Sequence, residues 1–317
     1  MKTVLKGILY LILLLIVLVI GFVTWLNFSD LPSYPVAMTE ELKNLKVEVD
    51  STSVARGERL ASMLCVKCHM GEGNKMVGKE LADLPKEFGK IHAYNITQDK
   101  ELGIGTWTDG EIAYFLKTGI RRDGTYAPPY MPKFPLMADV DLHAIIAWLH
   151  SDRPNVQAAA VKQEKNDPNL LIRFLCRVAM KPLPLQASPI PAPDSNNQVA
   201  LGRYLTTGAL GCFQCHSENF KTNNEIEPEK SVGFFGGGNP MLDMEGNVVN
   251  SMNITPDPES GIGKYSEYEF MTLLHTGRRP DGKMVRYPME PYPMLNEKEL
   301  KAIYAYLKTV PPLHNKN

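Results

Sequence analysis

The sequence predicts an all-α protein with two tandem helical domains behind one N-terminal transmembrane helix. Three observations predict this fold: a long apolar run at the N-terminus, an internal repeat over most of the remainder, and an amphipathic helix pattern closing each copy of the repeat. A length of 317 residues, with 44% hydrophobic and 22% charged, suits about two globular domains. We expect the anchor at residues 1–29, the domains at 50–155 and 196–313, and a connector at 156–195.

The N-terminal run is predicted to be a membrane anchor. Gly7–Phe28 holds no charged residue and, at 22 residues, is long enough to cross a bilayer's hydrocarbon core as a helix. A cleaved signal peptide, the alternative, would have a shorter apolar core and a cleavage site of small residues, whereas the bulky Trp25 and Phe28 end this run. Lys2 and Lys6 before the run place the N-terminus inside and the remainder outside the membrane.

Each expected domain carries the pentapeptide Cys-x-x-Cys-His, as Cys65–His69 and Cys212–His216. Two thiols at this spacing can each form a thioether to a haem, and the adjacent histidine then ligates the iron. A zinc site would have to pool both motifs and would leave each histidine without a purpose; a redox dithiol is the other alternative. The motifs therefore predict two covalently bound haem c groups. Their attachment residues are Cys65, Cys68, Cys212 and Cys215, and their proximal iron ligands are His69 and His216.

The domains are two copies of one unit. Residues 95–149 align without a gap with residues 253–307, and 22 of these 55 pairs are identical, including Asn95-Ile96-Thr97 with Asn253-Ile254-Thr255. Between the motif histidine and Asn-Ile-Thr, the second copy is 11 residues longer. This insertion includes the glycine-rich stretch Gly233–Gly238, which we expect to form a surface loop near the haem edge.

The repeat also selects candidates for the second axial iron ligand. Methionine opposite histidine gives a closed site suited to electron transfer. Of 15 methionines, Met131 and Met289 occupy matching positions in proline-bounded loops before the last helix of each copy. Met284 and Met294 lie close to Met289 but have no matching methionine in the first copy, and no histidine outside the motifs recurs in both copies. Met131 and Met289 are therefore the predicted ligands.

Each domain is expected to end in a helix that crosses the first helix of the same domain. Apolar residues recur at i, i+3, i+4 and i+7 in both closing segments, which predicts one apolar stripe on each helix. The stripes are Leu142, Ile145, Ile146 and Leu149, and Leu300, Ile303, Tyr304 and Leu307. Asp139 and Asn296 are the expected N-cap residues.

The connector contains a short amphipathic segment followed by a proline-rich stretch. Residues 170–180 are too few and too charged to span a membrane, so we expect a helix packed on a domain, with the bilayer surface as the alternative. Within this segment we expect Cys176 to be a buried small residue rather than a reactive thiol. Five prolines between 182 and 193 predict a semi-rigid, extended link.

Taken in order, these motifs resemble the class I cytochrome c domain. The series runs from Cys-x-x-Cys-His through Asn-Ile-Thr-x-Asp, Gly-Ile-Gly, Thr-Gly, Asp-Gly and the methionine to the closing helix. More narrowly, the chain is similar to membrane-bound cytochrome c subunits of bacterial alcohol and gluconate dehydrogenases, over about residues 50–155 and 196–312. The resemblance implies His69 with Met131, and His216 with Met289, as axial pairs. Those subunits typically carry three haem motifs and often a C-terminal anchor, whereas this chain has two motifs and an N-terminal anchor.

The expected function is electron transfer rather than catalysis. A dihaem cytochrome would relay electrons at the outer, periplasmic face of a bacterial inner membrane, from a dehydrogenase or quinol-oxidising complex to a terminal oxidase or soluble carrier. Alternatives are a dihaem peroxidase or another haem enzyme, which needs an open iron position, and a haem-based sensor or structural subunit. With 34 basic and 35 acidic residues, the net charge of −1 does not favour nucleic acid as a partner.

Overall fold

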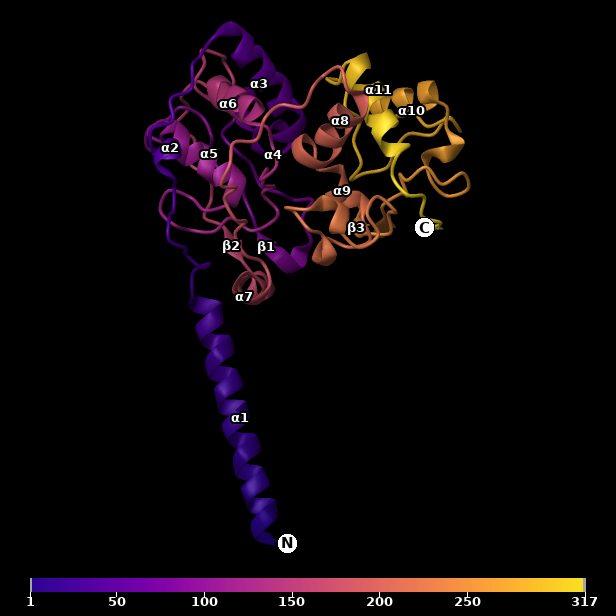
Figure 1. The fold of residues 1–317 in the computed structure, drawn as a ribbon. Coiled ribbons are helices and arrows are strands. Elements are labelled where there is room, and N and C mark those ends of the chain that lie inside the picture. Colours follow the sequence, from indigo (N-terminus) through magenta and orange to yellow (C-terminus); the bar gives the residue numbers. More distant parts are fainter. Residues whose placement is uncertain (1, 316–317) are drawn as a thin grey trace.

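The computed structural model describes residues 2–315. Helix α1 (Lys2–Phe28) projects as a single rod from a body formed by the rest of the chain (Figure 1). It is long and apolar enough to cross a membrane, and none of its most apolar stretch is buried against protein. The apolar helix predicted at the N-terminus is therefore present.

The first half of the body surrounds one cluster of buried side chains, called the first lobe here. Its helices are α3 (Ser51–Leu64), α4 (Val66–His69), α5 (Asp109–Thr118) and α6 (Asp139–Leu149). The predicted stripe of α6 is buried in this cluster, together with Trp148. The short helix α2 (Glu40–Lys43) packs against α5.

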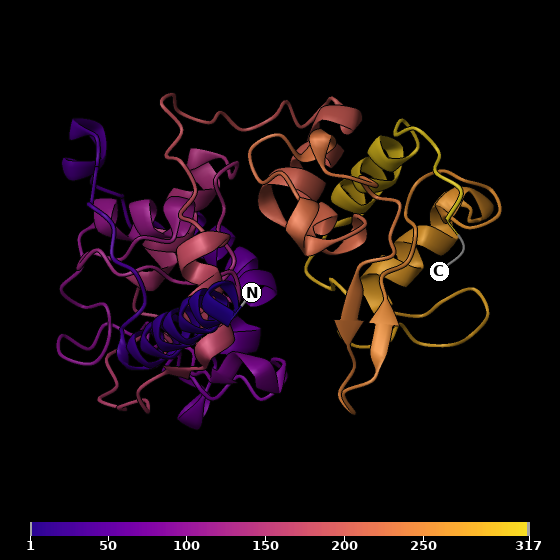
Figure 2. The same cartoon turned by 90° about the horizontal axis from the view of Figure 1, so that it is seen from below.

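The second half surrounds a separate cluster, called the second lobe. Helix α8 (Gln198–Arg203) continues as a π-helical turn, η3 (Tyr204–Ala209), and is followed by α9 (Cys212–His216), α10 (Glu267–Thr276) and α11 (Glu297–Leu307). Figures 1 and 2 show the two lobes side by side, with α1 attached to the first.

In each lobe the first and last helices cross, as predicted, and the structure places a glycine at each crossing. A β-carbon on Gly57 of α3 would lie 1.8 Å from the carbonyl oxygen of Ala144 in α6. A β-carbon on Gly202 of α8 would lie 1.9 Å from the carbonyl oxygen of Ala302 in α11. Because no other residue lacks a β-carbon, glycine alone permits this backbone contact. Ala144 and Ala302 are matching positions of the repeat.

The N-terminal caps match between the two copies for α5 and α10 but differ for α6 and α11. Capping boxes begin α5 (Thr108 with Glu111), α10 (Ser266 with Glu269) and α11 (Asn296 with Glu299), so the predicted Asn296 cap is confirmed. The prediction for Asp139 is wrong: the N-cap of α6 is Ala138, and Asp139 is the first helical residue. Its carboxylate instead accepts hydrogen bonds from Lys117 Nζ at 2.6 Å and from the amide of Ile190 at 2.9 Å.

Apart from isolated single-residue bridges, the strands in the described residues form two short antiparallel pairs. Strand β1 (Gly89–Lys90) pairs with β2 (Asp167–Pro168), and β3 (Pro240–Leu242) pairs with β4 (Val248–Asn250). Helix α7 (Leu170–Val178) follows β2. The remaining single turns are the 3-10 segments η1 (Glu72–Asn74), η2 (Lys86–Phe88), η4 (Phe220–Thr222), η5 (Pro228–Lys230) and η6 (Ile262–Lys264).

The glycine-rich stretch of the second copy corrects a prediction. We expected Gly233–Gly238 to be a surface loop, but Phe235 is fully buried in the second cluster, and Gly236 and Gly237 are buried beside it. The amide of Gly237 donates to the carbonyl of His216 at 2.7 Å, which places the stretch next to the motif. Exposed residues of this longer segment lie instead in the β3–β4 hairpin and within 218–232. Apolar packing around Phe235 explains the difference.

Direct contacts hold the lobes together. Arg59 on α3 donates two hydrogen bonds to the carboxylate of Glu299 on α11, at 2.7 and 2.9 Å. The buried carboxylate of Asp141 accepts from Arg56 within the first lobe and from the Tyr204 hydroxyl of the second. Burial raises the pKa of Tyr204, so its hydroxyl keeps the proton that it donates. The two lobes are therefore joined by charge-assisted bonds.

Candidate functional site

The ring of His69, at the end of α4, is oriented by the backbone. Its Nδ1 lies 2.8 Å from the carbonyl oxygen of Tyr94. A carbonyl oxygen only accepts, so Nδ1 carries the proton and Nε2 carries the free lone pair. Nε2 makes no hydrogen bond within residues 2–315. A histidine held in this way through its other ring nitrogen has the arrangement typical of a metal ligand.

His216, at the end of α9, repeats this arrangement. Its Nδ1 lies 2.8 Å from the carbonyl oxygen of Met252. Tyr94 and Met252 match in the repeat, and each directly precedes Asn-Ile-Thr. The bond uses a main-chain carbonyl, which explains why the side chains at this position can differ.

The Asn-Ile-Thr turns hold those carbonyls in place. Asn95 Oδ1 accepts from the amide and the hydroxyl of Thr97 at 2.9 and 2.7 Å, and Asn253 Oδ1 accepts from Thr255 at 2.8 and 2.7 Å. All four side chains are buried. Sequence reasoning found the identity of the two triads but not this role; the only signal was their fixed spacing from the other repeated motifs.

Burial lowers the pKa of both motif histidines, and the carbonyl hydrogen bonds only partly oppose this shift. A lowered pKa favours the neutral imidazole, which is the form that ligates a metal. Both rings are therefore held in a protonation state and tautomer that suit coordination through Nε2.

The four motif cysteines are free thiols. Burial raises the pKa of Cys65 and of Cys212 to about 12 and raises the pKa of Cys68 and Cys215 as well. A redox dithiol needs the opposite shift. No group of three or more His, Cys, Asp or Glu side chains that could hold a metal ion occurs in the described residues. The raised pKa values of the motif thiols do not favour the dithiol alternative.

The two predicted methionines lie in matching loops. The amide of Met131 donates to the carbonyl of Pro128, and that of Met289 donates to the carbonyl of Arg286, both at 3.0 Å. Three residues later, each loop returns to the preceding helix by a 2.8 Å bond, from Phe134 to Leu116 and from Tyr292 to Leu274. The backbone therefore repeats along with the sequence.

The two predicted methionines are more buried than the neighbouring methionines Met284 and Met294. Met131 and Cys65 both pack, partly buried, against the first cluster, and Met289 and Cys212 pack against the second. By contrast, Met284 is 57% exposed and Met294 is 49% exposed. The structure thus places each predicted methionine against the same core as its motif.

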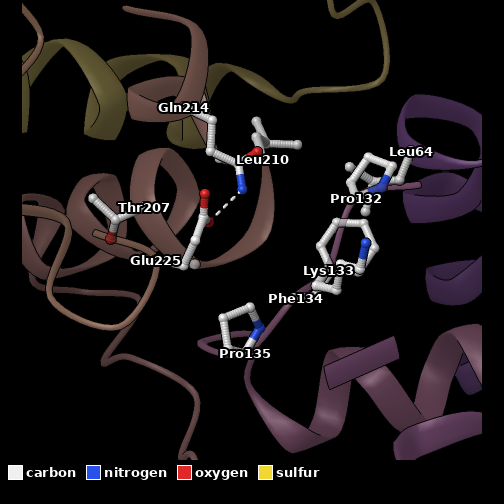
Figure 3. Close-up of a pocket in the computed structure, with 11 residues that line it drawn as sticks. Leu64, Pro132, Lys133, Phe134, Pro135, Thr207, Leu210, Gln214 and Glu225 are labelled. Atoms are coloured by element: carbon white, nitrogen blue, oxygen red, sulfur yellow. Dashed lines mark hydrogen bonds between the residues drawn. The ribbon is translucent and has the colours of Figure 1, made fainter. Parts of the chain in front are cut away.

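The two motifs face the junction of the lobes. Lys67, within the first motif, forms an ion pair of 2.9 Å with Glu290, next to Met289, and its Nζ lies 4.4 Å from the ring centre of Tyr287. A cavity of about 50 Å³ is lined by residues of both lobes, which Figure 3 draws as sticks. Gln214 of the second motif lines it and donates to Glu225 at 2.6 Å, opposite Lys133, which follows Met131 by two residues.

These donors fit haem c: each lobe offers two thiols, one oriented neutral imidazole and one thioether. Haem would be held covalently by Cys65 and Cys68, or by Cys212 and Cys215, with Nε2 of His69 or His216 on the iron.

The helical fold and the haem-type donors of each lobe are those expected of a c-type cytochrome. Comparison with known proteins agrees. Residues 54–152 match the family model described as Cytochrome c, so this part of the chain is similar to cytochrome c domains. This confirms the resemblance found in the sequence.

The relatives are more specific. The cytochrome c subunit of an alcohol dehydrogenase (quinone) from Gluconacetobacter polyoxogenes is 30% identical over 283 residues, which cover 84% of this chain and 58% of that protein. The gluconate 2-dehydrogenase cytochrome c subunit of Pantoea cypripedii is 26% identical, covering 83% and 60%. A diheme cytochrome c-type protein of Cereibacter sphaeroides is 28% identical, covering 82% and 86%.

The chain spans little more than half the length of the first two of these relatives. Both are named as the cytochrome c subunit of a dehydrogenase. Similarity to cytochrome c subunits agrees with the electron-transfer function expected from the sequence.

Proposed function

We propose that this chain is a membrane-anchored dihaem c-type cytochrome that relays electrons between redox proteins. Its two lobes correspond to tandem class I cytochrome c domains at residues 50–155 and 196–313, each with one covalent haem c. The donor is a dehydrogenase or a quinol-oxidising complex, and the acceptor is a terminal oxidase or a soluble carrier. When bound, haem c supplies a one-electron iron couple.

One observation carries this proposal: the two motif histidines have the same protein surroundings. Both donate from Nδ1 to the carbonyl that precedes Asn-Ile-Thr, at 2.8 Å in each lobe. A repeat that preserves a ligand's orientation to this degree supports two sites of one kind. We assign Met131 and Met289 as the second axial ligands because their loops repeat equally well and pack against the same cores.

The arrangement of the lobes supports a relay rather than two independent sites. Lys67 of the first motif pairs with Glu290 beside Met289, and Arg59 binds Glu299 across the same junction. These bonds hold the first motif against the loop that bears the second methionine. A fixed distance between two redox groups is what stepwise transfer within one chain requires.

Helix α1 supports the membrane location. We propose that it is an uncleaved single-pass anchor in a bacterial inner membrane, with both lobes in the periplasm. Its length and apolarity fit a span, and Lys2 and Lys6 precede its apolar run. Relatives named as dehydrogenase subunits support assembly with a redox enzyme as donor.

The test is quantitation of haem in the purified full chain by pyridine haemochrome, followed by a redox titration and exposure of the reduced protein to carbon monoxide. Two haems per chain without carbon monoxide binding are expected. One haem per chain would contradict the dihaem assignment. Carbon monoxide binding by the native reduced protein would contradict closed sites and favour a peroxidase or another haem enzyme.

A further inference from the structure

Helix α7 has two apolar faces, of which only one is covered. Ile172 and Cys176 are fully buried and pack with Tyr126. This confirms the expected packing on a domain. The opposite side carries Leu171, Phe174 and Val178, which are 43%, 40% and 57% exposed. Their i, i+3 and i+7 spacing forms one stripe, and nothing in residues 2–315 covers it.

This stripe lies where α1 joins the body. Arg173 of α7 donates to the carbonyl of Ser29, directly after α1. Arg177 donates to the hydroxyl of Ser29 and to the carbonyl of Asp30, both at 2.7 Å, and its guanidinium lies 4.9 Å from the ring centre of Trp25. Two arginines therefore fasten α7 to the end of α1.

The direction of α7 fits the plane of a bilayer that α1 crosses. Figure 1 draws α7 end-on at the lower edge of the body, beside the upper end of α1, whose axis runs within the picture. The two helices therefore lie across each other. Seen from below, in Figure 2, α1 stands over the first lobe.

We propose that α7 lies in the headgroup region of the bilayer that α1 spans, with Leu171, Phe174 and Val178 inserted toward the acyl chains. This inference rests on the proposed anchor. A lipid surface is the occupant because the stripe lies beside Trp25 and Phe28, at the end of the proposed span. Phe28 is 83% exposed. Segment 170–178 also contains no acidic residue that would repel anionic headgroups.

A consequence of this second membrane contact is that the orientation of the body relative to the bilayer is fixed. A single span leaves the body free to tilt about its tether, whereas a second contact, rigidly bonded to the first, sets the height and direction of the first lobe above the membrane. Through the bonds of Arg59 and Asp141, the same orientation is passed to the second lobe.

The test is lipid photolabelling of the full haem-loaded chain. The protein is reconstituted into vesicles of phosphatidylcholine and phosphatidylglycerol that contain phosphatidylcholine with a diazirine on its acyl chain. After irradiation, adducts are mapped by peptide mass spectrometry. Adducts are expected in α1 and in segment 170–178.

A triple variant, Leu171→Gln with Phe174→Gln and Val178→Gln, is expected to lose the adducts of α7 and keep those of α1. The matched control, Met244→Gln with Val248→Gln, changes exposed apolar residues of the β3–β4 hairpin and should leave the labelling pattern unchanged.

Adducts in α1 without adducts in segment 170–178 of the wild-type chain would overturn the inference while leaving the anchor intact, and would favour a protein as the occupant of the stripe. Absence of adducts from both segments would contradict the proposed anchor itself.

Discussion

Lys67 Nζ and Glu290 Oε1 lie 2.9 Å apart, and this ion pair joins the first Cys-x-x-Cys-His motif to the loop that bears Met289. Both side chains are about half exposed, so the pair contributes only about 0–1 kcal/mol to stability. Its significance is positional, because it connects two segments that are more than 200 residues apart in the chain.

Reversing one charge of this pair should loosen the junction. Glu290→Lys would face Lys67 with a like charge, so we expect faster hydrogen exchange in residues 284–295 and slower electron equilibration between the two sites. The double reversal, Lys67→Glu with Glu290→Lys, restores the attraction and should return both readings toward the wild type. Unchanged hydrogen exchange in Glu290→Lys would show that the pair does not hold the loop.

The axial methionines can be tested by substitution with matched controls. Met131→Ala and Met289→Ala each remove a thioether from the proposed iron position, so one haem per chain should become high-spin and bind carbon monoxide when reduced. Met284→Ala and Met294→Ala change exposed methionines of the same loop region and should leave both spectra as in the wild type. The assignment fails if Met284→Ala or Met294→Ala, rather than Met289→Ala, opens the second site.

The glycines at the helix crossings should resist substitution. Glycine to alanine inside a helix ordinarily stabilises by about 1 kcal/mol. At Gly57 the new methyl group would meet the Ala144 carbonyl at 1.8 Å, so Gly57→Ala should instead destabilise the first lobe by about 1–3 kcal/mol. Gly202→Ala should do the same in the second lobe. Denaturant unfolding followed by circular dichroism measures both, with Ala55→Gly on the exposed side of α3 as a control that should destabilise by only about 1 kcal/mol.

The buried carboxylate at the lobe junction should matter more than the exposed ion pair. Asp141→Ala would leave Arg56 and the Tyr204 hydroxyl without their acceptor, at a cost of about 1–3 kcal/mol. Tyr204→Phe removes one hydrogen bond and should cost about 1 kcal/mol. The loss of stability is measured by thermal unfolding, and the loosening of the lobe junction by the rate of protease cleavage within residues 182–193. Equal effects from both variants would argue against Asp141 as the centre of the contact.

Stability should fall at alkaline pH partly because of Cys176. Burial raises the pKa of this thiol to about 11, whereas a thiol in an unfolded chain titrates near 8.5. Between these values the native state binds more protons than the unfolded state, so stability is fully present below about pH 8.5 and declines as pH rises through about 11.

The variant that tests this prediction is Cys176→Ala. Its loss of stability at alkaline pH should be smaller than that of the wild type, because the thiol is gone while the titration of the tyrosines contributes as before. Denaturant unfolding at about pH 7 and about pH 10 gives the two stabilities. An identical decline in both proteins would show that the thiol does not contribute. The native thiol should also resist alkylation, as expected for a buried residue.

The sequence predicted the closing helices, their crossing with the first helix of each copy and the Asn296 cap, because these depend on local periodicity and on a repeat visible along the chain. It was wrong for Asp139 and for Gly233–Gly238. Asp139 is drawn away from the cap position by Lys117 and the connector amide of Ile190. The glycine-rich stretch is buried because Phe235 enters the second core. In both cases a distant partner overrode a local preference.

The sequence by itself predicted the attachment residues, because thioether chemistry needs two cysteines and a histidine at one local spacing. The repeat alone reduced the candidate axial ligands from 15 methionines to two. Tertiary structure decided the rest. Only the folded chain brings the carbonyls of Tyr94 and Met252 to the histidine rings, sets Lys67 against Glu290, and turns one face of α7 outward beside α1. These relationships join residues far apart along the chain, and their geometry depends on how whole helices pack.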